Sequence, residues 1–286
     1  MNILIIGSEG SIGKSIKNHF LKKKNVNNII CIDKVQNQKK IKKIYYKKLD
    51  LSQNIQSKII FKKKIDIVFF LSFNLNFKKV EKKKYIKEGK NIIKNGLKII
   101  KQNRVKKIIY FSSFAVYGKK RGIIKESDLT RPFTLYGKLK KYSENKIISN
   151  SSNYKYLILR ISQIYGSQIK TNIINKFILN TKSGQKIYLY GSGKQKRDFL
   201  SIKDFLTLID KLYNFETSGI YNVCGDRSFS IMQILNILNY KFKIKTINNE
   251  DFNLVGDNTK LKKKFKWKPS INFKKEIIKM KKLIKI

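Results

Sequence analysis

The chain has 286 residues with a formal net charge of +47, and 41% of its residues are hydrophobic, which is enough for the core of one large domain or two small ones and excludes intrinsic disorder. Two cysteines far apart in the sequence and a single histidine exclude a disulfide framework, a zinc cluster and a Ser/His/Asp triad. The longest apolar run, residues 67–71, is too short for a membrane span and no basic segment precedes the first apolar run, so a cytoplasmic protein is expected.

Short apolar runs alternate with longer stretches of helical periodicity in the first half of the chain. Helices are predicted near residues 11–21, 53–63, 79–102 and 135–150, and buried strands at residues 3–6, 29–32, 44–47, 66–71, 107–111 and 156–160. This alternation predicts parallel βαβ units whose right-handed crossovers place helices on both faces of one sheet. The predicted fold class is therefore α/β, a Rossmann-type doubly wound parallel sheet.

The pattern changes after Gly166 to shorter, mixed elements. Helices are predicted at residues 203–213, 231–238 and 272–283. We expect residues 1–165 to form a dinucleotide-binding domain and residues 166–286 to form a smaller C-terminal lobe that binds substrate, with interleaving of the two as an alternative.

A glycine loop directly follows the first predicted strand. Gly7, Gly10 and Gly13 have the spacing GxxGxxG and open the first helix. Such a loop lets backbone N–H groups, here including those of Ser11 and Ile12, approach a pyrophosphate at the positive end of the helix. The alternative is that these glycines only form a strand-to-helix turn.

Two acidic positions follow the next strands. Asp33 ends the second strand, 20 residues beyond Gly13, where a carboxylate accepts hydrogen bonds from the adenosine ribose and repels a 2′-phosphate. This favours NAD over NADP as the cofactor. Asp50 and Leu51 follow the third strand, at the sheet edge where an adenine can lie, and a helix N-cap at Asp50 is the alternative.

A Tyr-x-x-x-Lys pair lies at the start of the helix predicted from residue 135. The spacing of Tyr136 and Lys140 puts both side chains on one helix face, and a nearby ammonium favours tyrosinate. Bringing a phenol from a pKa of about 10 toward 7 requires roughly 4 kcal/mol of differential stabilisation. Tyr136 is the predicted acid/base for a substrate hydroxyl, and Ser113, at the end of the fifth strand, either hydrogen-bonds the same oxygen or caps the strand end.

Together these motifs resemble the extended short-chain dehydrogenase/reductases, in particular the UDP-glucose 4-epimerase-like members of the NAD-dependent epimerase/dehydratase family. The resemblance spans nearly the whole chain and also rests on the segments SSFAVYG at 112–118, YGSG at 190–193, RDF at 197–199 and DNTK at 257–260. It implies that Ser113 and Tyr136 flank a sugar hydroxyl and that Lys140 holds the nicotinamide ribose. It also implies that Arg197 grips a diphosphate, for which a surface ion pair with Asp198 is the alternative.

Several positions depart from the family's pattern. Its dehydratases have an Asp-Glu pair where this chain has Phe114 and Ala115 after Ser113, so dehydration is disfavoured. Gln163 stands where many members have an asparagine that contacts the diphosphate. The stretch 246–256 lacks the second phosphate-binding arginine that epimerases usually have.

The resemblance and the motifs predict an NAD-dependent nucleotide-sugar epimerase of the 4-epimerase type. A keto-sugar reductase or dehydrogenase of the same fold, and a non-catalytic protein that binds a dinucleotide or a polyanion, are the alternatives. A homodimer built from the helices around residues 92–100 and 147–148 is also considered, although these isoleucines can equally face the core. Only six of the 65 basic residues are arginines and the lysines are dispersed, so no specific nucleic-acid partner is expected.

Overall fold

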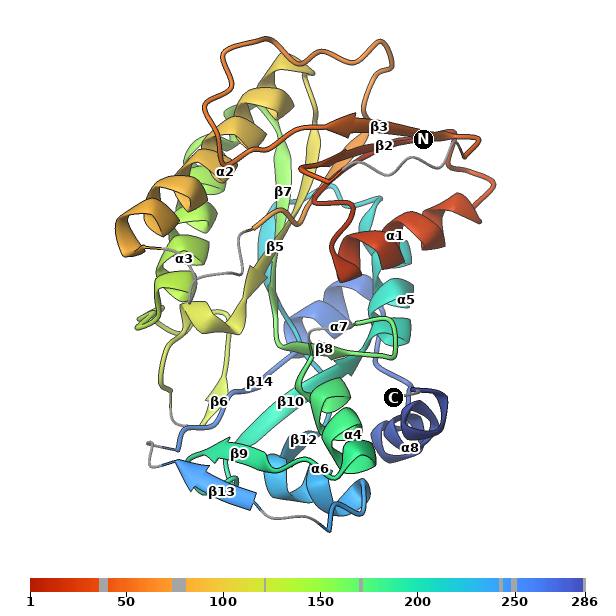
Figure 1. Cartoon of the computed structure of the whole chain (residues 1–286). Helices are drawn as coiled ribbons and strands as arrows, with labels where there is room; N and C mark the ends of the chain where they lie inside the picture. Colours follow the sequence, from red (N-terminus) through yellow and green to blue (C-terminus); the bar gives the residue numbers. More distant parts are fainter. Residues whose placement is uncertain are drawn as a thin grey trace. The chain divides into compact units, whose positions relative to one another are not determined.

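The structure, a computed structural model, describes residues 1–35, 41–73, 81–120, 122–169, 172–241, 244–247 and 251–284 (Figure 1). The chain folds into two compact units and passes between them several times. The first unit consists of Met1–Gly118, Thr130–Arg160 and Tyr213–Ile220, and the second of Lys119–Leu129, Ile161–Leu212 and Tyr221–Ile286.

A seven-stranded sheet with the order β11-β7-β5-β4-β1-β2-β3 confirms the predicted α/β class. The registered pairs β1–β2, β2–β3, β1–β4 and β4–β5 are all parallel. After β3 the chain returns past β1 to add β4 on the other side, so the strand order reverses at β1, where ligands of open parallel sheets bind. The strands are β1 (Asn2–Ile6), β2 (Asn28–Asp33), β3 (Ile44–Lys48), β4 (Ile67–Phe70), β5 (Lys107–Ser113), β7 (Lys155–Ile161) and β11 (Gly219–Val223).

Helices of the first unit cover both faces of this sheet (Figure 1). On one face, Phe20 of α1 (Ser11–Leu21) packs against Phe69 of β4, with ring centroids 5.3 Å apart. On the other face, α2 (Lys82–Gln102) and α3 (Leu135–Ser149) bury their isoleucines against alternate residues such as Phe70 and Tyr110. Because the central strands are buried on both sides, they appear in the sequence as continuous apolar runs.

The helix predicted at residues 53–63 is wrong, because the segment between β3 and β4 has no helix. Polar side chains of α2 bind its backbone instead: Asn95 donates to the carbonyls of Leu51 and Gln53, at 2.9 and 2.7 Å, and Gln102 accepts from the N–H of Ile59 at 3.0 Å. These bonds replace the intrahelical ones and leave Ile59 buried. The helix predicted from residue 79 begins at Lys82, and residues 79 and 80 lie outside the described ranges.

The second unit contains the shorter, mixed elements that the sequence predicts. Its largest sheet has the order β12-β10-β8, and two strand pairs, β13–β9 and β14–β6, accompany it. Three of its helices were predicted, while α4, α7 and the short strands were not. The elements are β6 (Ile123–Ile124), β8 (Gln163–Tyr165), α4 (Ile173–Ser183), β9 (Ile187–Tyr190), β10 (Lys196–Ser201), α5 (Ile202–Leu212), β12 (Ser228–Ser230), α6 (Ile231–Ile237), β13 (Ile244–Ile247), β14 (Val255–Gly256), α7 (Thr259–Phe265) and α8 (Phe273–Leu283).

None of the helices in the described ranges combines the length and the apolar character that a membrane crossing requires.

Candidate active site

The glycine loop leads from β1 into α1, and two of its glycines are required by the chain's own packing. Gly7 has a φ of +90°, and a Cβ on it would lie 2.7 Å from the backbone nitrogen of Ser72. A Cβ on Gly13 would overlap the carbonyl oxygen of Gly7. These close approaches fold the loop tightly against the ends of β1 and β4.

Gly10 differs, because the chain itself leaves room for a side chain there. A Cβ on Gly10 would meet only the Gly7 carbonyl oxygen, at an ordinary 3.6 Å. Gly10 is the N-cap of α1, it is exposed, and it makes no side-chain capping bond. The first intrahelical acceptor bond runs from Lys14 to Gly10, so the earlier N–H groups of Ser11 and Ile12 have no intrahelical acceptor. The N-terminus of α1 thus presents backbone N–H groups, and the glycine at its N-cap has no side chain to block them. Such a helix N-terminus is suited to bind a pyrophosphate.

Asp33 lies beside this loop. Its Oδ2 accepts from the backbone N–H of Glu9 at 2.9 Å, and its Oδ1 accepts from that of Val35 at 3.1 Å. The sequence did not single out Glu9, whose carboxylate forms a buried ion pair with Lys17 of α1. Burial lowers the pKa of Lys17, but the hydrogen bond and charge of Glu9, together with Tyr46, outweigh this, and the net pKa is raised. The pair fixes the loop that carries the Asp33 contact.

Asp50 and Leu51 lie after β3, as predicted. The Asp50 Oδ1 accepts from the backbone N–H of Ser52 at 2.9 Å, and Leu51 is buried. Asp50 therefore caps a turn, and the alternative of a helix N-cap is wrong because no helix follows in residues 51–66. A contact of these residues with an adenine stays a prediction.

Ser113, Tyr136 and Lys140 come together in the first unit. Thr134 caps α3 by accepting from the N–H of Gly137 at 3.0 Å. Gly137 lies so close to η1 (Phe114–Val116) that a Cβ would overlap the carbonyl oxygen of Ala115. This close approach places the Tyr136 phenol near the Ser113 hydroxyl, whose interaction with it lowers the pKa of the phenol. Ser113 also caps η1, accepting from the N–H of Ala115 at 3.2 Å.

Lys140 is only 3% exposed. Its Nζ donates to the carbonyl of Phe111 at 2.6 Å and lies 4.5 Å from the ring centre of Phe73 and 4.9 Å from that of Tyr110. Burial lowers the pKa of Lys140 to about 7, and the charge of Glu144 opposes this. The ammonium therefore titrates in the neutral range.

The expectation that Lys140 lowers the pKa of Tyr136 is not met in this structure. Burial raises the pKa of Tyr136, and its hydrogen bond with Ser113 only partly offsets the effect. The Lys140 Nζ is bonded to the strand and lies 5.9 Å from the centre of the Tyr136 ring. Tyr136 is therefore protonated at neutral pH. The free energy lost when the phenolate is removed from water is larger than the stabilisation that its contacts provide.

Gln163 and Arg197 belong to the second unit, on the adjacent strands β8 and β10. Arg197 donates to the carbonyls of Lys196, at 3.0 Å, and Phe252, and its guanidinium lies 4.8 Å from the Phe252 ring centre. Asp198 points elsewhere, accepting from the N–H of Gly256 at 2.5 Å, so the predicted alternative of an ion pair with Arg197 is not the arrangement found.

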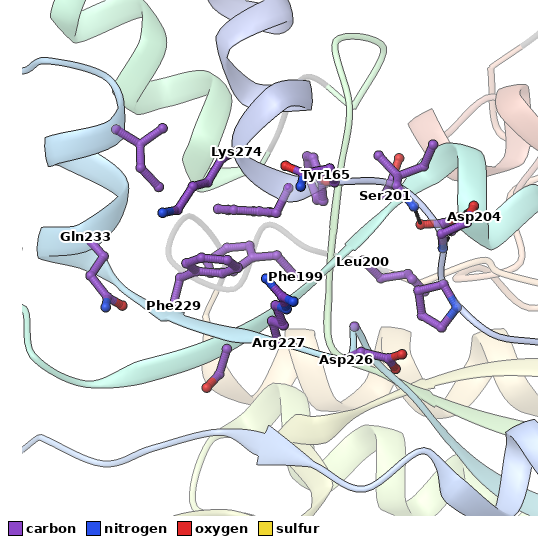
Figure 2. A pocket seen from close by; sticks show the side chains of 18 of the residues that line it. Tyr165, Phe199, Leu200, Ser201, Asp204, Asp226, Arg227, Phe229, Gln233 and Lys274 are labelled. Atoms are coloured by element: carbon purple, nitrogen blue, oxygen red, sulfur yellow. Dashed lines mark hydrogen bonds between the residues drawn. The ribbon is translucent and has the colours of Figure 1, made fainter.

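The second unit also contains a cavity of about 1150 Å³ (Figure 2). Phe199 and Phe229 line it together with Arg227 and Lys274. Asp204, at one side, already accepts from the backbone N–H groups of residues 270 and 271 at 2.9 and 3.0 Å. Neither Gln163 nor Arg197 lines this cavity.

We expect Asp198→Asn to stabilise the protein at high pH. Asp198 is 2% exposed, and burial raises its pKa to about 7 from an ordinary 3.8. Because the folded protein holds this proton up to about pH 7 and the unfolded chain only up to 3.8, the free energy of unfolding falls as the pH rises from 3.8 through 7. At pH 8 the charged Asp198 therefore costs about 4 kcal/mol of stability compared with its neutral form below pH 3.8. Urea unfolding should show the variant gaining stability at pH 8 and not at pH 4.

Asp257→Asn is the control of opposite sign, because hydrogen bonds from Thr259 lower the pKa of Asp257. This variant should lose stability between about pH 4 and 8. Parallel pH curves for Asp198→Asn and the unmodified protein would contradict the assignment of a neutral Asp198.

The chain is similar to known proteins in sequence and in fold. A family model described as "NAD dependent epimerase/dehydratase family" matches residues 3–224. The chain is 28% identical over 267 residues to a dTDP-D-glucose 4,6-dehydratase of Dictyostelium discoideum, covering 81% of this chain but only 60% of that protein. It is 24% identical to a putative UDP-glucose 4-epimerase of Methanocaldococcus jannaschii, covering 96% and 95%. The structure of UDP-glucuronic acid 4-epimerase from Bacillus cereus in complex with NAD has the same fold, with a TM-score of 0.85, 20% identity and complete coverage of both chains.

Proposed function

The chain belongs to the NAD-dependent epimerase/dehydratase family, and from this premise we propose that it is a nucleotide-sugar epimerase of the 4-epimerase type. Its being an NAD-dependent enzyme follows from the family, and the sequence-based prediction of an NAD enzyme is confirmed to that extent. The observation that carries the proposal is the grouping of Ser113, Tyr136 and Lys140 at the sheet edge that also carries the glycine loop.

The residues that would hold NAD are those of the first unit. The open N-terminus of α1, at Gly10, Ser11 and Ile12, suits the pyrophosphate, and Asp33 suits the adenosine ribose. Lys140 has the charge and the place for the nicotinamide ribose. NAD supplies reversible acceptance of a hydride when it is bound.

Tyr136 is the proposed acid/base. In the oxidising direction the phenolate oxygen of Tyr136 takes the proton of a sugar hydroxyl. In the reducing direction the phenol returns that proton to the sugar oxygen, whose carbon now has the opposite configuration. Ser113, whose hydroxyl lies near this phenol, orients the same sugar oxygen. Because burial favours the phenol and Lys140 does not lower its pKa in this structure, ionisation of Tyr136 requires added positive charge, which the nicotinamide of bound NAD would supply.

Arg197 and Gln163 are the proposed contacts of the substrate diphosphate. Arg197 keeps a planar guanidinium whose contacts on the described residues include two neutral carbonyls, so it retains charge for a phosphate. Dehydration is not proposed, although relatives include dehydratases, because Phe114 and Ala115 offer no carboxylate behind Ser113. A keto-sugar reductase that uses the same Tyr136 is the second candidate.

A homodimer gains no support from the isoleucines considered for it. Ile92, Ile93, Ile99, Ile100 and Ile147 are all buried in the core cluster of the first unit, and Ile148 is partly buried against it. The exposed positions of α2 are instead lysines, namely Lys82, Lys83, Lys84, Lys87, Lys90, Lys94 and Lys101. Dimerisation through this face therefore stays a prediction that like-charge repulsion opposes at low salt.

Asp33→Asn should reduce the preference for NAD over NADP. Loss of the carboxylate removes one ribose hydrogen-bond acceptor and the repulsion of a 2′-phosphate, so the ratio of the two dissociation constants should fall about tenfold or more. Calorimetric titration with each dinucleotide measures this ratio. Asp66→Asn, before β4 at the opposite end of the sheet, serves as the control and should leave the ratio unchanged. An unchanged ratio in Asp33→Asn would remove Asp33 from the cofactor site.

The proposed reaction is tested by supplying NAD with UDP-glucose or UDP-galactose and following the sugar nucleotide and the NADH absorbance together. Interconversion of the two sugars without net NADH is the expected result. Consumption of NADH with a keto-sugar nucleotide would favour the reductase instead. Binding of NAD without turnover of any of these substrates would contradict the proposed substrate class.

A further inference from the structure

A buried carboxylate lies directly behind the Tyr136–Lys140 pair. Glu144 is on α3, one turn after Lys140, and is 0% exposed. Its Oε1 accepts from the hydroxyl of Ser112 at 2.5 Å and from the Nε of Arg160 at 3.0 Å. The Nη2 of Arg160 donates to its Oε2 at 2.8 Å. Both carboxylate oxygens are thus occupied by donors from β5 and β7.

Arg160 extends this network toward η1. It is 2% exposed, and its Nη1 donates to the hydroxyl of Tyr117 at 3.0 Å while its guanidinium lies 4.8 Å from the Tyr117 ring centre. Glu144 therefore joins α3, β5 and β7 through one bidentate ion pair and one hydroxyl bond. Such a pair is weak evidence of a contribution to stability, because apolar residues of similar volume are often as stable. Its presence next to the acid/base pair calls for another explanation.

The geometry of α3 against β5 supplies one. Two bonds join the helix to consecutive strand residues: Lys140 donates to the carbonyl of Phe111 at 2.6 Å, and Ser112 donates to Glu144. Residues 140 and 144 are one helical turn apart, so these two hydrogen bonds together fix the position of α3 along the axis of β5. Ser113 is the next residue of the strand, and Tyr136 is one turn earlier on the helix.

Electrostatics gives a second reason. The charge of Glu144 favours the ammonium form of Lys140, against the burial that disfavours it. No carboxylate other than Glu144 acts on Lys140 among the contributions resolved for the described residues. The remaining charged or titratable groups around this site are Tyr136 on α3, Tyr110 on β5, Tyr85 on α2 facing Tyr136, Lys141 on α3 at 3.7 Å from Glu144, and Arg160 on β7.

We propose that Glu144 is a positioning residue: it sets the register of Ser113 against Tyr136 and its negative charge sustains the ammonium form of Lys140. The kinetic part of this inference rests on the proposed function. The electrostatic part does not, because the ionisation of Lys140 is measurable in the protein without substrate.

The first test removes the charge and keeps the shape. Since Glu144→Gln leaves the buried Arg160 without its carboxylate partner and risks unfolding, the double variant Glu144→Gln/Arg160→Gln is made beside it. NMR titration of the lysine ε-carbon resonances, assigned with Lys140→Arg, should show the pKa of Lys140 falling by about one unit or more in both variants. Glu81→Gln, at the exposed N-cap of α2, should leave it unchanged. An unchanged Lys140 in a folded double variant overturns the electrostatic part.

The second test separates register from charge. Ser112→Ala removes one hydrogen bond and leaves Glu144 and Arg160 paired, so the pKa of Lys140 should be unchanged. The kcat for the sugar interconversion should fall about tenfold, with little change in KM. In Glu144→Gln/Arg160→Gln, the alkaline limb of the pH–rate profile should move to lower pH together with Lys140. A Ser112→Ala enzyme with unchanged kcat overturns the register part. If the unmodified protein turns over no sugar nucleotide, the proposed function fails while the titration still decides the role of Glu144.

Discussion

Tyr136→Phe is expected to lower turnover of UDP-galactose by about 10²- to 10⁴-fold, the range that a lost general acid/base produces. The substitution keeps the aromatic ring, which packs edge-on against Phe73 with centroids 5.1 Å apart, and removes only the hydroxyl near Ser113. Fold and cofactor affinity should therefore be preserved. Steady-state rates, with calorimetric titration of NAD on the same preparation, measure both quantities.

Tyr142→Phe is the matched control for this prediction. Tyr142 is on the same helix, but its ring contacts Lys90 and Lys146 rather than the site residues. Turnover should be unaffected. If Tyr136→Phe kept more than a tenth of the original rate, a different group would have to exchange the proton of the substrate hydroxyl.

Gly10→Ala should weaken the binding of NAD, whereas Gly13→Ala should lower the stability of the protein. This difference tests whether the pyrophosphate binds at Gly10. At Gly10 the added methyl has an ordinary contact with the chain, so the fold should survive at a cost of about 1 kcal/mol, because alanine is a poorer helix N-cap than glycine. The methyl would stand where the backbone has to approach a phosphate, so NAD should bind at least about tenfold more weakly, which corresponds to 1.4 kcal/mol.

Gly13→Ala instead damages the protein itself. Its methyl would overlap the carbonyl oxygen of Gly7, and the backbone of the loop would have to move. Overpacking of this kind costs about 1–3 kcal/mol, which thermal unfolding should register as a lower Tm. A Gly10→Ala protein that binds NAD like the unmodified chain would place the pyrophosphate away from this loop.

The first unit was predictable because its strands are buried on both faces. Continuous apolar runs such as Ile3–Ile6 are typical of strands buried on both faces of a parallel sheet, and the glycine loop and Asp33 follow from their places at the ends of β1 and β2. The segment 53–63 was not predictable in this way. Its backbone forms hydrogen bonds with Asn95, Lys98 and Gln102 of α2, whose roles appear only when the helix lies beside it.

The sequence was sufficient to predict which residues form the site, but not how deeply they are buried or which charged groups surround them. The i, i+4 spacing brought Tyr136 and Lys140 together, but the burial that raises the pKa of Tyr136 cannot be inferred from local spacing. The Glu144–Arg160 pair was missed for the same reason, since its partners lie on three separate elements. A glutamate one turn beyond Lys140, on the buried helix face, was the only local indication.

The central claim is that Tyr136 exchanges only the hydroxyl proton of a sugar nucleotide while bound NAD is returned unchanged. The most direct measurement is to run the interconversion of UDP-glucose and UDP-galactose in deuterium oxide with NAD, and to determine the mass of the product sugar nucleotide and the NADH formed. We predict conversion with no deuterium on carbon and no net NADH. Deuterium on carbon, accumulation of NADH, or the absence of any product would contradict the account.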